Sequence, residues 1–453
     1  MGYLQQVLFL AAIALASYLI LRRGRLIAST IRLGRDEDRT DRPQERLKIM
    51  ALVAFGQKKM FAKPLVAFMH LVIYLGFIII NIEVLEIILD GILGTHRLFA
   101  PYTSALYPFL INIFEVLALG VLLVCVGFLA RRYLLKVARF QPERYREMGR
   151  WPRTDAAIIL VIEIVLMLAF LTWNASDTVL RLRGDEHYQV AGLQPFIVSQ
   201  WFMPLFEGWN TSALIAYERV AWWAHILGIM AFAVYLSYSK HLHILLAFPN
   251  VYFSKLAPKG EMQNMPEVTN EVKIMLGLSQ PEVATDAPET PAPDSGVPGK
   301  FGAKDVMDLT WKNLMDAYSC TECGRCTAAC PASITGKKLS PRKIMMDTRD
   351  RLEDIGRNTQ ANGGEFKDDG KTLLGDYILD EEILACTSCQ ACVQECPVNI
   401  NPLDIIYQLR RYRVMEESKA PGLWNGMFSN LENNQAPWKF SPADRFNWAE
   451  GLK

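Results

Sequence analysis

Eight of the nine cysteines stand in two copies of one motif, C-x2-C-x2-C-x3-C-P. The first copy contains Cys320, Cys323, Cys326 and Cys330. The second copy contains Cys386, Cys389, Cys392 and Cys396. Three thiolates on one short loop can bind three corners of an iron–sulfur cubane, and the proline turns the chain away after the fourth. The two motifs therefore predict two [4Fe–4S] clusters.

The pairing of cysteines with clusters follows from the motif. In two-cluster ferredoxins the fourth cysteine of each run binds the other cluster. We therefore predict that the first cluster is held by Cys320, Cys323, Cys326 and Cys396. The second is then held by Cys386, Cys389, Cys392 and Cys330. Zinc is the alternative, but zinc ribbons use paired C-x2-C units without the third and fourth cysteines of this motif. The ninth cysteine, Cys125, is better explained by packing.

Four of the six histidines lie in long apolar stretches, namely His70, His225, His241 and His243. An imidazole inside a membrane helix is costly and usually has a function. Two imidazoles from different helices can bind the iron of a b-type haem from both sides. His225 and His243 are 18 residues apart, so one continuous helix would carry them on the same face, about 27 Å apart. Interfacial or hydrogen-bonded polar side chains are the alternative, above all for His241 and His243.

Four acids fall within or at the ends of the same stretches: Glu83, Glu86, Glu115 and Glu163. A carboxylate is costly in lipid unless it faces other helices or water. Because quinone chemistry takes up or releases protons, an acid beside a quinone has a use. We take Glu115 and Glu163 as candidates for a quinone or proton site. Hydrogen bonding between helices or placement near an interface is the alternative, favoured for Glu83 and Glu86.

The chain of 453 residues is 51% apolar and carries a net charge of +1. This composition excludes a disordered chain, and no basic excess indicates a nucleic-acid partner. Five apolar stretches are long enough to cross a bilayer core of about 30 Å. They cover residues 3–21, 64–88, 105–130, 156–173 and 216–248. Buried helices of a large soluble domain are the alternative, although such helices rarely follow one another in this way.

Lysine and arginine predict the orientation. Residues 21–63 hold twelve of them and residues 131–153 hold eight, against one and two in the other connections. The positive-inside rule then places the first and third connections in the cytoplasm, the N-terminus outside and everything after the fifth span inside. The first span lacks a basic leading region and a cleavage site, so we expect it to be retained. We predict a multi-pass protein of the inner (cytoplasmic) membrane.

The soluble part divides by composition. Residues 1–250 form the membrane domain, and residues 251–300 an interfacial segment and a proline-rich linker. Residues 301–415 form the dicluster domain, with helices expected to begin at Ser340-Pro341 and near Pro402. Residues 416–453 form an aromatic-rich tail that docks onto a partner or packs back onto its own domain.

The sequences FMHLVIYLGF and AHILGIMAFAVYLSYSKHLHIL resemble the five-span cytochrome b (gamma) subunit of respiratory nitrate reductase and the membrane subunits of heterodisulfide-reductase-like complexes. In the nitrate reductase subunit, two histidine pairs hold two haems stacked across the bilayer. The resemblance implies an inner haem b on His70 and His243 and an outer one on His225. The partner of His225 would stand at position 80, which here is Ile80. We therefore predict one inner haem and leave a second open.

Residues 305–415 resemble the C subunit of heterodisulfide reductase and the iron–sulfur arms of fumarate reductase and glycerol-3-phosphate dehydrogenase. In heterodisulfide-reductase-like complexes a b-type cytochrome, a dicluster ferredoxin and a cysteine-rich CCG unit recur. This chain resembles the first two joined together. The resemblance therefore implies a CCG-domain iron–sulfur partner on another chain, or a flavoprotein similar to electron-transfer flavoprotein.

We thus expect a mainly α protein, a five-helix transmembrane bundle with a cytoplasmic helical dicluster (alpha-helical ferredoxin) domain. Its expected function is that of the electron-transfer subunit of a respiratory oxidoreductase. It would pass electrons between a cytoplasmic partner, two [4Fe–4S] clusters, haem b and the membrane quinone pool. One alternative is quinol oxidation that feeds a cytoplasmic acceptor. Another, from a different class, is a non-catalytic membrane-anchored redox sensor.

Overall fold

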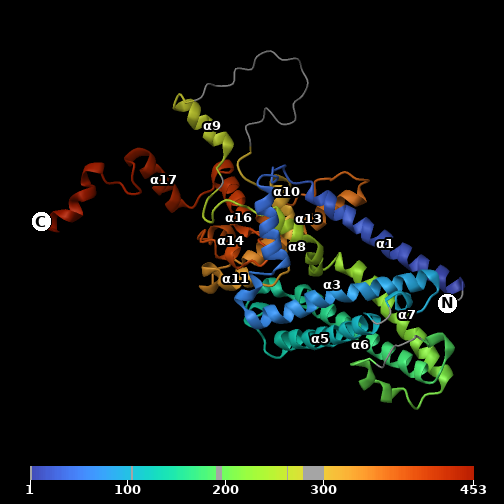
Figure 1. Ribbon diagram of the computed structural model, residues 1–453. Helices are drawn as coiled ribbons and strands as arrows, with labels where there is room; N and C mark the ends of the chain where they lie inside the picture. The colour runs from blue at the N-terminus through green and yellow to red at the C-terminus, as the bar shows by residue number, and fades with distance from the viewer. Residues whose placement is uncertain (1–2, 104–105, 190–195, 263, 279–299, 453) are drawn as a thin grey trace.

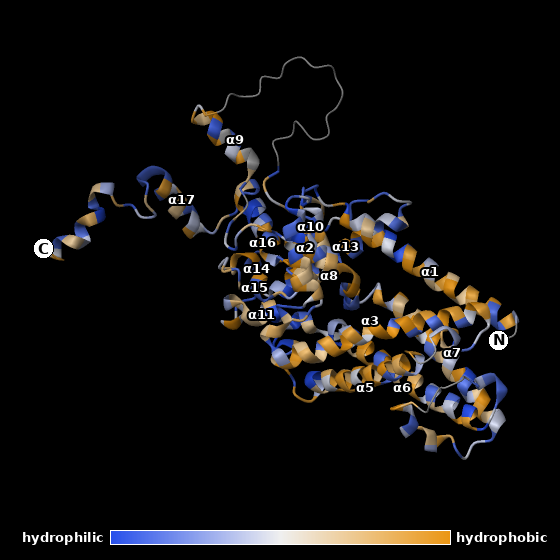
Figure 2. Cartoon of the chain, in the orientation of Figure 1, coloured by the Kyte–Doolittle hydropathy of each residue, from blue (hydrophilic) through white to orange (hydrophobic). Residues whose placement is uncertain are grey.

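The computed structural model describes residues 3–103, 106–189, 196–262, 264–278 and 300–452, and in these ranges the protein is mainly helical and has no β-strand. In those ranges five helices are long and apolar enough to cross a membrane, as predicted. They are α1 (Tyr3–Ile31), α3 (Pro64–Leu93), α5 (Leu106–Tyr133), α6 (Arg150–Leu182) and α7 (Thr211–Leu236). Figure 2 shows that most residues of these helices are hydrophobic, whereas the C-terminal half is more mixed in hydropathy. This is a membrane protein with a soluble helical domain at one end of its helices (Figure 1).

Shorter helices complete the fold. In the N-terminal half and the segment after it these are α2 (Pro43–Met50), α4 (Ala100–Thr103), α8 (His243–Tyr252) and α9 (Pro266–Met275). The soluble domain begins with α10 (Trp311–Ser319), α11 (Arg325–Ala329), α12 (Pro331–Ile334) and α13 (Pro341–Ala361). It continues with α14 (Asp380–Leu384), α15 (Ala391–Glu395) and α16 (Pro402–Arg411), and α17 (Gly422–Asn434) follows.

The spanning helices are longer than the apolar stretches that predict them. Helix α1 continues ten residues past the predicted end, to Ile31, and α6 runs to Leu182. Hydropathy marks only the part that crosses lipid, whereas a helix continues until a breaker or a cap ends it. Residue 105, the predicted start of the third span, lies outside the described residues.

The fifth span is where the prediction is wrong. It assumed one helix over residues 216–248, but α7 ends at Leu236 and α8 begins only at His243. Ser237 and Ser239 turn their hydroxyls onto the carbonyls of Val234 and Leu236, and such local bonds compete with helix continuation. His225 and His243 therefore do not share one face of a continuous helix.

The helices predicted in the soluble half are confirmed. Helix α13 begins after Ser340, whose hydroxyl accepts the backbone N–H of Lys343. Helix α16 begins after Asn401, whose side chain caps the N–H groups of Leu403 and Asp404. Both have proline at the first helical position, where no N–H is needed.

The two halves pack directly against each other. Gly34, just after α1, lies so close to the start of α10 that a Cβ would meet the nitrogen of Trp311 at 2.5 Å. Next to it Arg35 exchanges backbone hydrogen bonds with Leu309 and Trp311. The core of the soluble domain also includes Ile27 from α1. Packing therefore fixes the soluble domain against the end of the helical bundle that contains Ile31 and Gly34.

The C-terminal tail extends away from the body of the protein (Figure 1). Its aromatic side chains are 68–75% exposed, namely Trp438, Phe440, Phe446 and Trp448. This excludes close packing of these side chains onto the dicluster domain, one of the two expectations. The predicted proline-rich linker falls largely on residues 279–299, outside the described residues.

Candidate electron-transfer centres

The two cysteine motifs fold as copies of one loop. Glu322 and Gly324 in the first have φ of 54° and 69°, and the equivalent Ser388 and Gln390 have φ of 58° and 64°. Each loop leads into a five-residue helix, α11 or α15, that ends at the fourth cysteine of its motif. The left-handed residues curl the backbone around its own cysteines. The sequence repeat is thus also a repeat of backbone conformation.

The thiols form two groups, and the sequence predicts that each group takes its fourth cysteine from the other motif. Cys320, Cys323, Cys326 and Cys396 line one small pocket, which Cys392 also reaches. Cys330 is within electrostatic range of Cys386 and Cys389. Helices α11 and α15 pack together between the two motifs. The exchange of fourth cysteines between the clusters stays a prediction.

Backbone N–H groups point at the sulfurs, as iron–sulfur thiolates require. Ile400 donates to Cys396 Sγ at 3.3 Å and Ser388 to Cys386 Sγ at 3.4 Å. Burial raises the pKa of the Cys320 thiol to about 11, so a bound cation is needed to hold the thiolate form. No group of three or more described His, Cys, Asp or Glu residues is arranged to hold a single metal ion. Thiolates on separate irons of a cubane are spaced more widely than the ligands of one zinc.

The first thiol group faces the membrane half. Lys59, in the connection before α3, donates its ammonium to the carbonyl of Cys396 at 3.1 Å. Arg325, beside Cys326, donates to the carbonyl of Lys59 at 3.2 Å. Contacts in both directions therefore join the first cluster loop to the inner end of the bundle.

A buried ion triad forms a second connection there. Glu322, between Cys320 and Cys323, is 4% exposed and accepts from Lys240 at 2.5 Å and from Arg349 at 2.6 Å. Burial opposes its ionisation, but the charges of Arg349 and Lys240 prevail and lower its pKa to about 2. A fixed negative charge therefore sits in the first cluster loop.

The second thiol group faces away from the membrane half. Cys389 is exposed and Cys386 is partly exposed. Arg410 of α16 donates to the carbonyls of Ile383, Leu384 and Cys386. Lys59 of the membrane half also reaches the carbonyl of Val393, next to Cys392, at 3.4 Å. The exposed Cys389 marks the part of this centre that solvent reaches.

Three histidines gather at the end of the bundle that faces the soluble domain, close to the first thiol group. His70 lies within electrostatic range of His243 and Arg325. His241 and His243 have ring centroids 5.5 Å apart. The break after α7 turns this segment back toward α3, which brings His243 and His241 within electrostatic range of His70. That His70 and His243 hold a haem stays a prediction.

His70 and His243 differ from His241 in the hydrogen bonds of their ring nitrogens. His70 Nδ1 donates to Gln57 Oε1 at 3.1 Å, and His243 Nδ1 donates to the Lys240 carbonyl at 3.0 Å. Each bond keeps the proton on Nδ1 and leaves Nε2 as the lone-pair nitrogen that binds iron. No ring bond of this kind is recorded for His241 among the described residues. His70 and His243 therefore each present an Nε2 that could bind iron, and a haem between them stays a prediction.

His225 does not fit a two-histidine haem site. Its Nδ1 donates to the Leu166 carbonyl at 3.1 Å. It is 3% exposed, and its ring lies 5.8 Å from Phe170 and 6.3 Å from Trp173. In the described part of the chain no second imidazole interacts with it. The sequence has Ile80 where the resemblance expects a histidine partner for His225, and no other described histidine takes that place.

The predicted acids separate by their contacts. Glu115 accepts hydrogen bonds from Asn174, Val198 and Ser199, which makes it an anchor for the loop before α7. Glu163, in α6, is partly buried beside Cys125, and no hydrogen bond joins its carboxyl to another described residue. Glu163 is therefore the better candidate for exchanging a proton.

The outer-end acids also differ. Glu86 accepts from Tyr107 at 2.8 Å and from the N–H of Phe99 at 2.7 Å. This agrees with the helix-to-helix role favoured for it. Glu83 is 3% exposed, and its Oε2 has no hydrogen-bond partner in the described structure. Helix-to-helix hydrogen bonding therefore accounts for Glu86 but leaves Glu83 unexplained.

Sequence reasoning missed Gln57, Lys240 and Glu322. Gln57 lies before α3 in a segment without periodic pattern. Lys240 lies inside the predicted fifth span, where the sequence indicated no role for it. Glu322 carried one signal, an acid between two cysteines of a motif, but nothing in the sequence indicated its partners.

Comparison with known proteins agrees with this description. Residues 319–400 match the family described as "4Fe-4S dicluster domain". The chain is 28% identical to "Probable iron-sulfur-binding oxidoreductase FadF" of Bacillus subtilis (strain 168), over 98% of this chain and 60% of that protein. It is 25% identical to "EtfAB:quinone oxidoreductase" of Syntrophomonas wolfei, over 91% of this chain and 55% of that protein. The chain thus spans somewhat over half the length of these relatives.

A shorter match falls on "Probable membrane-anchored ferredoxin" of Chromohalobacter salexigens, 34% identical over 34% of this chain and 24% of that protein. No solved structure matches. These similarities support an electron-transfer role. The chain is therefore a membrane protein with five candidate spanning helices and a C-terminal 4Fe-4S dicluster domain.

Proposed function

We propose that this chain conducts electrons between a cytoplasmic redox partner and quinone in the membrane. The observation that carries the proposal is the docking of the first thiol group onto the inner histidines. Lys240 contributes to both centres, because its carbonyl accepts from His243 and its ammonium binds Glu322. Electrons can therefore pass from the first thiol group to the histidines through packed residues, without crossing the proline-rich linker in residues 251–300.

The positions of the residues give the order of the centres. Cys386, Cys389, Cys392 and Cys330 hold the entry cluster, which lies on the accessible side. Cys320, Cys323, Cys326 and Cys396 hold the second cluster in the path, against the bundle. His70 and His243 hold one haem b at its inner end. These iron centres, when bound, supply one-electron transfer in steps.

Quinone reduction also needs protons, two for each quinone that takes up two electrons. We propose Glu163 as the group that delivers them, because its carboxyl lies in the membrane without a fixed partner. Glu115 is less suited, since donors already occupy its oxygens.

We propose reduction of quinone as the direction. A relative named for EtfAB and quinone favours a partner similar to electron-transfer flavoprotein, and a CCG-domain iron–sulfur subunit is the second candidate. The charges of the connections favour an N-terminus outside and the dicluster domain in the cytoplasm. Quinol oxidation toward a cytoplasmic acceptor would use the same centres in reverse.

The test is an optical and kinetic experiment on the purified full-length protein. We expect a sharp b-type haem band after reduction by dithionite, and reoxidation of that band when a soluble quinone analogue is added. Glu163→Gln should slow the reoxidation at least tenfold and leave the band unchanged. Iron–sulfur absorption without a haem band, or a band that quinone does not affect, would contradict the proposal and favour the redox sensor.

A further inference from the structure

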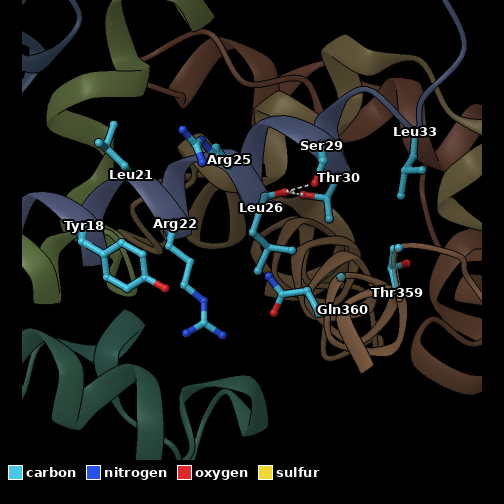
Figure 3. Close-up of a pocket in the computed structure, with 12 residues that line it drawn as sticks. Tyr18, Leu21, Arg22, Arg25, Leu26, Ser29, Thr30, Leu33, Thr359 and Gln360 are labelled. Atoms are coloured by element: carbon cyan, nitrogen blue, oxygen red, sulfur yellow. Dashed lines mark hydrogen bonds between the residues drawn. The ribbon is translucent and has the colours of Figure 1, made fainter. Parts of the chain in front are cut away.

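A cavity of about 660 Å³ lies between the inner end of α1 and the C-terminal part of α13. Its volume is within the range of small-molecule and lipid sites. Both halves of the protein line it, with Arg22, Arg25 and Leu26 from α1 and Gly356 and Gln360 from α13. Figure 3 shows the guanidinium of Arg22 and the amide of Gln360 on the same side of α1.

The cavity carries uncompensated positive charge. Arg22 and Arg25 are exposed, and neither forms a hydrogen bond or an ion pair with another described residue. Both residues line the cavity, and Figure 3 shows Arg22 extending on the side of Gln360, whereas the guanidinium of Arg25 lies on the other side of α1. Arg23, between them, is 9% exposed and forms a two-bonded pair with Glu353. The protein thus satisfies one arginine of this run and leaves the other two at the cavity.

The position along α1 matches the boundary of the bilayer. Arg22 lies about 27 Å along the helix from Leu4, which is close to the thickness of the hydrocarbon core. The apolar part of α1 that precedes it is 6% buried, so this part of the helix faces lipid. Tyr18, 60% exposed, lines the cavity one turn before Arg22, where interfacial aromatic residues belong.

From the membrane toward the soluble domain, the lining is first an apolar helix surface and then the Arg22 guanidinium and the Gln360 amide. That order matches a phospholipid, whose acyl chains lie in the core and whose phosphate lies at the interface. Arginine is suited to phosphate because its planar fork donates two parallel hydrogen bonds. Gln360 adds a donor from the soluble domain, on the opposite wall.

Close packing shapes the far side of the site. A Cβ on Gly356 would meet Leu26 Cδ1 at 3.0 Å, so glycine allows α13 to approach α1 at the floor of the cavity. A lipid held there touches both halves at once. We propose that this cavity binds the headgroup of an anionic phospholipid, which bridges α1 to the dicluster domain.

Native mass spectrometry of the full-length protein in detergent tests the site. We expect the wild type to retain added phosphatidylglycerol in preference to phosphatidylcholine. Each arginine near the surface strengthens anionic-lipid binding by about fivefold. The double variant Arg22→Gln/Arg25→Gln should therefore bind phosphatidylglycerol roughly 30-fold more weakly.

Matched variants separate the site from general charge and from misfolding. Arg32→Gln/Arg35→Gln removes two exposed arginines just beyond α1 that do not line the cavity, and it should retain wild-type affinity. Arg22→Lys/Arg25→Lys keeps the charge and should retain most of the binding. Equal losses in the two glutamine variants would overturn the proposal, because the lipid would then follow net charge.

Inorganic phosphate separates a lipid site from a free-anion site. We expect millimolar phosphate to leave the retained lipid in place, because the acyl chains on α1 contribute to binding. Displacement of the lipid by phosphate, or equal retention of the neutral lipid, would also overturn the proposal.

Discussion

Lys240 and Glu322 join the histidine end of the membrane bundle to the first cysteine loop, with a nitrogen-to-oxygen distance of 2.5 Å. Lys240 is 10% and Glu322 3% exposed at the side chain. A buried pair of this kind costs desolvation and adds little net stability. We therefore expect its main effect to be electrostatic, since it fixes a negative charge beside the first cluster.

Glu322→Gln tests that effect. Removing a negative charge near an iron–sulfur cluster stabilises its reduced form, so the reduction potential of the first cluster should rise by roughly 50–100 mV. A redox titration followed by electron paramagnetic resonance measures it. Glu365→Gln, an exposed acid in the loop after α13, is the control and should shift nothing. A fall in potential, or equal shifts in both variants, would contradict the expected charge effect.

The inner histidines give a second prediction. His70→Ala and His243→Ala should each abolish the b-type haem band and leave both cluster signals, because each removes one axial ligand. His241→Ala is the matched control, since it removes the neighbouring imidazole, and it should keep the band. The reduced-minus-oxidised spectrum checks all three variants. Loss of the band in His241→Ala with retention in His243→Ala would reassign the ligand.

The predicted exchange of Cys330 and Cys396 between the two clusters gives a third prediction. Cys396→Ser should alter the same paramagnetic signal as Cys320→Ser, although the two residues belong to different motifs. Cys330→Ser should alter the other signal, together with Cys386→Ser. If Cys396→Ser instead matched Cys386→Ser, each motif would hold its own cluster and the exchange would be wrong.

The equivalent left-handed positions of the two cysteine loops, Gly324 and Gln390, give a fourth prediction. Gly324→Ala adds a Cβ at φ +69° that would meet Arg342 Nη1 at 2.5 Å. The left-handed backbone alone costs about 1–2 kcal/mol, so thermal stability and iron content should fall. Gln390→Gly at the equivalent site removes that strain and should leave stability unchanged or raise it by up to about 1 kcal/mol. Thermal unfolding with iron analysis measures both variants, and a stability loss in Gln390→Gly would show that its side chain is needed.

The contact between the halves gives a fifth. Glu353→Gln leaves Arg23 buried without its ionic partner, which should cost roughly 2–4 kcal/mol. Hydrogen exchange should become faster in α13, where that helix packs on α1. Glu381→Gln breaks an exposed pair with Lys338, whose side chains are 60% and 64% exposed, and should cost under about 1 kcal/mol. Unchanged exchange in Glu353→Gln would mean that packing alone holds the halves together.

The sequence determined the elements that depend on local pattern. Apolar runs of about 20 residues predict membrane helices because backbone groups in lipid must bond within their own segment. The prolines at positions 341 and 402 predict helix starts because their fixed φ suits the first turn. The cysteine spacing indicates cluster loops because three sulfurs must reach one cubane. These features need no knowledge of what lies across space.

The tertiary structure decided what depends on distant partners. The break after Leu236 came from serine hydroxyls that compete for helix carbonyls, whereas hydropathy alone continues the span to residue 248. Gln57 acquires its role through His70, 13 residues away, and Lys240 and Glu322 meet across 82 residues. These contacts form only when separate segments pack together. Glu115 and Glu163 look alike in an apolar sequence, and surrounding donors alone distinguish an anchored carboxylate from one that can exchange a proton. Hydrogen bonds are short and directional, so no residue pattern along the chain can specify them.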